Sequence, residues 1–196
     1  MKLIFGSLLI VVALLILGGT FYPILQQEIN YDLHKYQVET DIKKITPLDT
    51  EFGIMIPKIN ANAHIIKDVD PFDSKVYQTA LTKGVAHAKG TSFPGQPGNI
   101  FLFSHSSSDF LNAMKYNSIF YLLTKLEKDD QIKIFYQGKE YLYSVQSKVT
   151  VKSDAVQYLS SDESKAETLT LMTCWPPGTS LKRLIVQAIR QIGRAH

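Results

Sequence analysis

The 196-residue chain has one cysteine, one tryptophan and only three arginines, against 18 lysines. A single cysteine excludes a scaffold held together by internal disulfides. The net charge of +3 is small and the lysines are scattered, which excludes the concentrated basic face that nucleic-acid binding requires. No histidine has partners at metal-ligand spacing, so we expect no metal and no cofactor.

Charge is also absent from Leu3 to Leu25, where leucine, isoleucine and valine dominate. About 20 apolar residues suffice to cross a bilayer as a helix, so the sequence predicts a transmembrane anchor over residues 1–25. A cleaved signal peptide is the main alternative, but its apolar region is shorter and ends in a small-residue cleavage site. The segment Gly18–Pro23 shows no such site.

Lys2 before the apolar stretch favours a cytoplasmic N-terminus, which makes the rest of the chain extracytoplasmic at the plasma membrane. Residues 26–50 are polar with mixed charge and are predicted to form a juxtamembrane stalk. Residues 51–196 are predicted to form one folded domain. An odd cysteine in an exported protein indicates intermolecular pairing or a reactive thiol. The alternative is that Cys174 is a small buried apolar residue.

The folded domain is predicted to be mainly β, a closed or nearly closed barrel with short helices, because short strands recur at regular spacing. Dense turn chemistry over Pro94–Asn99 precedes a strand-like run that ends at His105. The other expected strands are residues 52–56, 63–66, 131–136, 140–146, 168–173 and 183–189, with 149–151 as a possible extension. The expected helices are residues 73–81 and 109–128, with a helical turn over 155–159.

Three residue types suited to acyl transfer are placed around the strand ends. Cys174 and His105 both lie at the predicted C-terminal ends of strands, and Arg183 begins the strand that follows. A thiolate is the competent nucleophile, and an imidazole can take the thiol proton and later protonate a leaving amine. The rigid fork of a guanidinium can hold an oxyanion or a substrate carbonyl. The pattern therefore predicts thiol-based acyl transfer.

These residues resemble the sortase transpeptidases, through Thr-Leu-Met-Thr-Cys at 170–174, Arg183 nine residues later, and Phe-Ser-His-Ser at 103–106. The resemblance covers roughly residues 52–190 and looks nearest to class D or class E. It implies an eight-stranded sortase-type β-barrel, with Cys174 as nucleophile, His105 as general acid/base and Arg183 as the group that orients the substrate or oxyanion. The implied partners are proteins bearing a C-terminal sorting motif similar to LPxTG, and an amine acceptor in the cell wall or on a protein.

Several neighbouring residues have more than one interpretation. His87 is the alternative base, or else a hydrogen-bonded structural histidine. Thr173 and Trp175 are candidate substrate-binding residues, or else a strand residue and a packing residue. Ser104 and Ser106, which flank His105, are expected to be solvated, or else to orient the imidazole.

One further local motif resembles a feature of the family. Asp70-Pro71-Phe72 superficially matches the lid of the pilin-assembling class and is expected to be a turn.

A cysteine hydrolase or peptidase and a non-catalytic membrane-anchored β-domain are the alternative functions. The order of His105 before Cys174 disfavours a papain-like hydrolase.

Overall fold

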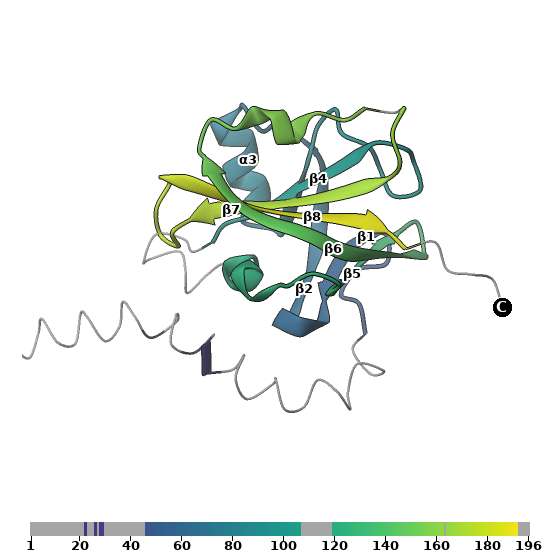
Figure 1. Cartoon of the computed structure of the whole chain (residues 1–196), viewed down its shortest axis with the longest axis horizontal. Helices are drawn as coiled ribbons and strands as arrows, with labels where there is room; N and C mark the ends of the chain where they lie inside the picture. The colour runs from purple at the N-terminus through teal and green to yellow at the C-terminus, as the bar shows by residue number, and fades with distance from the viewer. Residues whose placement is uncertain are drawn as a thin grey trace, which may run out of the picture.

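Eight strands close into a barrel in the computed structural model, which describes residues 22, 26, 28, 29, 46–106, 119–162 and 164–191 (Figure 1). The order around the barrel is β1-β2-β3-β4-β7-β8-β6-β5, and antiparallel pairing of β1 with β5 closes it. The predicted mainly β barrel is therefore confirmed. The strands are β1 (Phe52–Ile56), β2 (Ala61–Val69), β3 (Val85–Ala88), β4 (Asn99–Phe103), β5 (Gln131–Tyr136), β6 (Lys139–Lys152), β7 (Thr168–Trp175) and β8 (Lys182–Arg190).

Side chains alternate between two apolar clusters on the strands that carry the candidate site. On β4, Ile100 and Leu102 point into the barrel, whereas Phe101 and Phe103 belong to a second cluster outside it. The outer cluster is completed by Ala80 and other residues of β2, β3 and the helix α3 (Ser74–Leu81). Period-two alternation with both faces covered explains why all five residues of β4 are buried.

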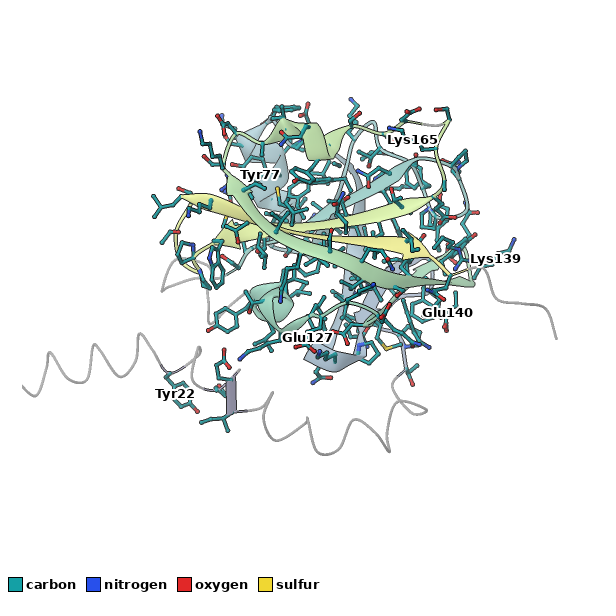
Figure 2. All side chains as sticks on the ribbon, in the orientation of Figure 1. Tyr22, Tyr77, Glu127, Lys139, Glu140 and Lys165 are labelled. Atoms are coloured by element: carbon teal, nitrogen blue, oxygen red, sulfur yellow. The ribbon has the colours of Figure 1, made fainter. Side chains whose placement is uncertain are left out.

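The helix α3 begins where the sequence predicts. The carboxylate of its N-cap, Asp73, accepts hydrogen bonds from the backbone N–H groups of Lys75 and Val76. In Figure 1 the helix lies above the strands, and Figure 2 labels its Tyr77, which packs against the outer cluster. The helix therefore covers part of the outer face of the barrel.

Three strand predictions need correction. The short strand β3 was not predicted, because it has only four residues and two of them are alanine, which is depleted in strands. The strand β6 runs unbroken to Lys152, past the predicted end at Gln146, and a register shift between Val145 and Ser147 disrupts its pattern. The strand β4 ends at Phe103, two residues before His105.

The predicted helix over 109–128 is wrong in the part that the structure describes, where a 3-10 helix, η2 (Tyr121–Lys125), stands instead. Residues 107–118 lie outside the described residues. The ammonium group of Lys148 donates to the backbone carbonyls of Thr124 and Leu126, at the C-terminal end of η2. Leu122 and Leu123 of η2 join the interior core. Two further 3-10 helices are η1 (Pro57–Ile59) and η3 (Val156–Leu159), the latter at the predicted helical turn.

The segment just before β1, residues 46–49, is hydrogen-bonded to β2. The side chain of Asn62 accepts from the N–H of Leu48 and donates to the carbonyl of Thr46. Asp49 lies 2.9 Å from Nδ1 of His64 and accepts from the N–H groups of Glu51 and Phe52. Burial raises the pKa of Asp49, but these hydrogen bonds outweigh it and hold the pKa below its usual range.

Asp49→Asn is expected to reduce the loss of stability on acidification. A carboxyl whose pKa is depressed in the folded state stabilises the fold above its unfolded pKa of about 3.9, and this contribution disappears as pH falls through the folded pKa. Urea unfolding between about pH 6 and pH 3 measures the slope. Asp154→Asn is the control, because the Asp154 carboxylate has no hydrogen bond or ion pair with the described residues. Equal slopes for the wild-type chain and Asp49→Asn would contradict the assignment.

The predicted anchor over 1–25 and stalk over 26–50 lie mostly outside the described residues. Tyr22, Gln26, Glu28 and Ile29 are helical, and Glu28 forms an ion pair of 2.9 Å with Lys125 of η2. Within the described part of the chain, no helix has the length and apolar character needed to span a membrane.

Candidate active site

The strand β7 places its cysteine directly opposite an arginine. The antiparallel register of β7 with β8 pairs Cys174 with Arg183. Directly opposed residues on antiparallel strands have Cβ atoms about 4.5–5.5 Å apart and point to the same face. The separation of nine residues in sequence thus becomes a single cross-strand step. In Figure 1 the end of β7 and the start of β8 lie together at the left of the barrel.

His105 reaches the same level from the other side of β7. The strands β4 and β7 are parallel, and their ladder pairs Phe103 with Met172. The N–H of Ser104 donates to the carbonyl of Met172 at 3.2 Å, so the parallel pattern continues one residue past β4. Continuation of this register places His105 beside Cys174, at the spacing of neighbouring strands, about 4.8 Å.

The alternation of side chains along the strands places Cys174, Arg183 and His105 on the same face of the sheet. Leu171 on β7 and Leu184 on β8 point into the barrel, so Cys174 and Arg183 have the parity of the outer face. On β4, Phe103 belongs to the outer cluster, and His105 has the same parity. The three residues predicted from sequence are therefore neighbours on the outer face, at the C-terminal ends of β4 and β7. Cys174 is half-buried.

The guanidinium of Arg183 is hydrogen-bonded to two backbone carbonyls at and just before the start of β8. Its Nη1 donates to the carbonyl of Ser180 at 3.1 Å and to that of Lys182 at 3.0 Å. Against the described residues, Nε–H and the two Nη2–H groups remain available as donors. The sequence predicted Arg183 but gave no sign of these two carbonyl partners.

Thr173 faces the barrel interior and is only 2% exposed, which leaves little of its side chain available to a substrate. Its hydroxyl donates to the carbonyl of Ser104 at 2.9 Å, which ties β7 to the residue before His105. Ser104 and Ser106 are buried rather than solvated as expected. The Ser106 hydroxyl has no hydrogen-bond partner among the described residues, for which we have no physical account.

Thr173→Val is expected to lower the free energy of unfolding by roughly 1–3 kcal/mol, because the shape is kept while the Ser104 carbonyl loses its buried donor. Urea denaturation measures the difference. Thr150→Val on the exposed part of β6 is the control and is expected to change stability by less than about 0.5 kcal/mol. Equal, small effects for both variants would show that the Thr173 hydroxyl contributes nothing.

Trp175 ends β7 opposite Lys182 and packs, partly buried, against the interior core. Of its two predicted roles, packing is the one that the structure displays. The indole lies one residue beyond Cys174 and has the opposite parity, so it belongs to the rim of the barrel.

His87, the alternative base, lies inside the barrel and is fully buried. Its Nδ1 accepts from the N–H of Asp68 at 3.4 Å, and its Nε2 lies 3.1 Å from both the Ser92 carbonyl and the Thr91 hydroxyl. This network assigns a neutral ring with the proton on Nε2. Burial lowers the pKa of His87, against the opposing effects of the Ser92 hydrogen bond and the Asp68 charge. Its surroundings are those of a structural histidine.

Asp70-Pro71-Phe72 is a turn between β2 and α3, as predicted, in which the N–H of Phe72 donates to the Asp70 carboxylate at 2.9 Å. In the part of the chain that the structure describes, no three His, Cys, Asp or Glu side chains are grouped so as to hold a metal ion.

Comparison with known proteins shows to which family the chain belongs. A model of the sortase domain matches residues 54–191. Sortase D of Bacillus subtilis (strain 168) is 31% identical over 142 residues, which cover 70% of this chain and 63% of that protein. The match therefore spans less than two thirds of the relative's length.

Solved structures share the fold. A lid mutant of sortase A from Corynebacterium diphtheriae superimposes with a TM-score of 0.61 and 24% identity, over 81% of this chain and 78% of that one. A sortase D5 transpeptidase from Clostridium perfringens does so with a TM-score of 0.58 and 20% identity, over 90% and 99%. The family resemblance predicted from the sequence is confirmed: the chain belongs to the sortases.

Proposed function

We propose that this protein is a membrane-anchored cysteine transpeptidase that cleaves a sorting motif similar to LPxTG and transfers the acyl fragment to an amine. The observation that carries the proposal is the register that sets Cys174 opposite Arg183, with His105 level with them two residues past the end of β4. Family membership adds the class of reaction.

In the first half-reaction, the sulfur of Cys174 attacks the carbonyl carbon of the scissile peptide bond. The thiol proton passes to the imidazole of His105, and the free donors of Arg183 stabilise the tetrahedral oxyanion. When the intermediate collapses, the C–N bond breaks and His105 returns the proton to the leaving amine. A thioester on Cys174 and a released C-terminal fragment result.

In the second half-reaction, an amine acceptor attacks the thioester carbonyl. His105 takes the proton of the attacking amine, Arg183 again holds the oxyanion, and the thiolate of Cys174 leaves. The imidazolium then reprotonates the sulfur, so that the enzyme is restored. The new amide joins the substrate protein to a cell-wall precursor or to another protein.

The uncharged stretch Leu3–Leu25 and the single lysine before it support a location at the outer surface of the plasma membrane. A protein held at that surface meets exported substrates and wall precursors, which supports the proposed partners. Water would compete with the amine as acceptor, and a predominance of hydrolysis would make the protein a cysteine peptidase instead.

The experiment uses the full-length chain in detergent with LPxTG-type peptides, with and without an amine acceptor. Mass spectrometry is expected to detect an acyl adduct on Cys174 and, with the acceptor present, a ligated product. Hydrolysis unaffected by the amine would support the peptidase. A folded protein that forms no adduct with any peptide and whose thiol resists alkylation would support the non-catalytic β-domain.

A further inference from the structure

The connection between β7 and β8 contains a turn closed by a threonine. Both the N–H and the hydroxyl of Thr179 donate to the carbonyl of Pro176, at 3.0 and 2.8 Å. Between them, Gly178 has a φ of +78°, a conformation that glycine adopts without strain. Two hydrogen bonds to one carbonyl thus fix the backbone from Pro176 to Thr179.

Packing does not fix this connection. Residues 178–182 are all exposed, and the side chain of Leu181 is 70% exposed. Apolar burial therefore contributes little to its conformation, whereas the strands on either side are held by their ladders. The hydrogen bonds of Thr179 are the main local constraint on the residue that follows it, Ser180.

The carbonyl of Ser180 is one of the two acceptors for Nη1 of Arg183. The other acceptor, the carbonyl of Lys182, lies within β8 and is placed by the ladder. Two acceptors on one nitrogen determine the plane of the guanidinium, and hence the direction of the donors on Nε and Nη2. A shift of the turn would move Ser180 and rotate the fork relative to Cys174.

We propose that Thr179 is a positioning residue, which acts through the Ser180 carbonyl to aim the guanidinium of Arg183 at the thiol. The predicted effect on catalysis rests on the proposed function, whereas the predicted effect on the guanidinium does not. This role explains why the exposed turn directly after β7 is closed by two hydrogen bonds from Thr179. Thr179 touches no reacting atom in this scheme.

The test compares Thr179→Val, which keeps the shape but loses the hydroxyl, with Thr179→Ser, which keeps it. Thr82→Val is a matched control, since the Thr82 hydroxyl also donates at 2.8 Å to the carbonyl three residues earlier on an exposed surface. All variants are made in the full-length chain.

The first readout is the nitrogen NMR spectrum of the arginine side chains, which is simple because the chain has only three arginines. Arg183→Lys assigns the Arg183 signals by their loss. Restricted guanidinium rotation is expected for Arg183 in the wild-type chain, in Thr179→Ser and in Thr82→Val, and faster rotation in Thr179→Val. An unchanged Arg183 signal in Thr179→Val would overturn the proposal whether or not the protein is active.

The second readout is the rate of acyl transfer. Thr179→Val is expected to lower kcat by about threefold to tenfold, the effect of one hydrogen bond, with little change in KM. In an Arg183→Lys background the same substitution is expected to have almost no further effect, because its consequence depends on the fork. The same fold-loss in both backgrounds would refute action through Arg183. Absence of transfer by the wild-type chain, with the NMR result as expected, would refute the proposed function alone.

Discussion

Cys174→Ala is expected to abolish the acyl adduct and to reduce transfer by about 10³-fold or more, because no other thiol exists in the chain to form the thioester. Mass spectrometry of the full-length protein after incubation with an LPxTG-type peptide measures the adduct. Chromatography of the peptide products measures transfer. Loss of the small, half-buried thiol removes little packing, so the thermal midpoint is expected to stay close to that of the wild-type chain.

Cys174→Ser sharpens this result. It keeps a proton-bearing group of similar size opposite Arg183, but an alkoxide is far harder to generate than a thiolate at neutral pH. We expect activity close to that of Cys174→Ala. Transfer that persists in either variant, or an adduct on any other residue, would exclude Cys174 as the nucleophile.

Arg183→Lys is expected to lower kcat/KM by about 10²-fold, the cost of one oxyanion donor, although the positive charge is kept. A lysine ammonium has three donors on one nitrogen, so bonding the Ser180 and Lys182 carbonyls would leave only one for the substrate, against the three that the guanidinium keeps. Steady-state kinetics of acyl transfer measures the ratio, and circular dichroism checks the fold.

Arg190→Lys is the matched control on the same strand. Arg190 lies 3.7 Å from Glu167 and stacks 4.7 Å from the centre of the Tyr141 ring, near the opposite end of β8. Its replacement is expected to lower stability without changing kcat/KM per folded molecule. Near-normal rates for Arg183→Lys, or equal losses for both variants, would remove Arg183 from the mechanism.

The elements that the sequence revealed are those with clear alternation, a run of large apolar residues or a clear cap. The hairpin of β5 and β6 alternates and has its turn at Gln137-Gly138, and Asp73 caps α3 as its position predicts. The strands β1 and β4 are buried at every residue and were still predicted, because each is a run of mostly large apolar residues. The strand β3 escaped detection because it has only four residues, two of which are alanine, a residue depleted in strands.

The residue types of the candidate site could be predicted from the sequence, but the contacts that hold the site in place could not. The thiol, the imidazole and the guanidinium stand out as scarce or strand-end residues. Two features came only from three-dimensional structure: that His87 is buried against Phe52 of the interior core, and that the Thr173 hydroxyl holds Ser104. The first depends on strand parity, and the second on pairing between segments 69 residues apart, which local sequence does not encode.

Closure of the barrel has a consequence for recognition. Each of the eight described strands is hydrogen-bonded on both sides, so none offers a free edge to which an extended peptide could add as a ninth strand. A polypeptide that reaches Cys174 must therefore dock across the strands, and its main-chain oxygens must find donors on side chains or connecting segments. If the proposed acyl transfer holds, selectivity would reside in residues that can be exchanged without disturbing the sheet, and substitutions there would be the route to new peptide motifs.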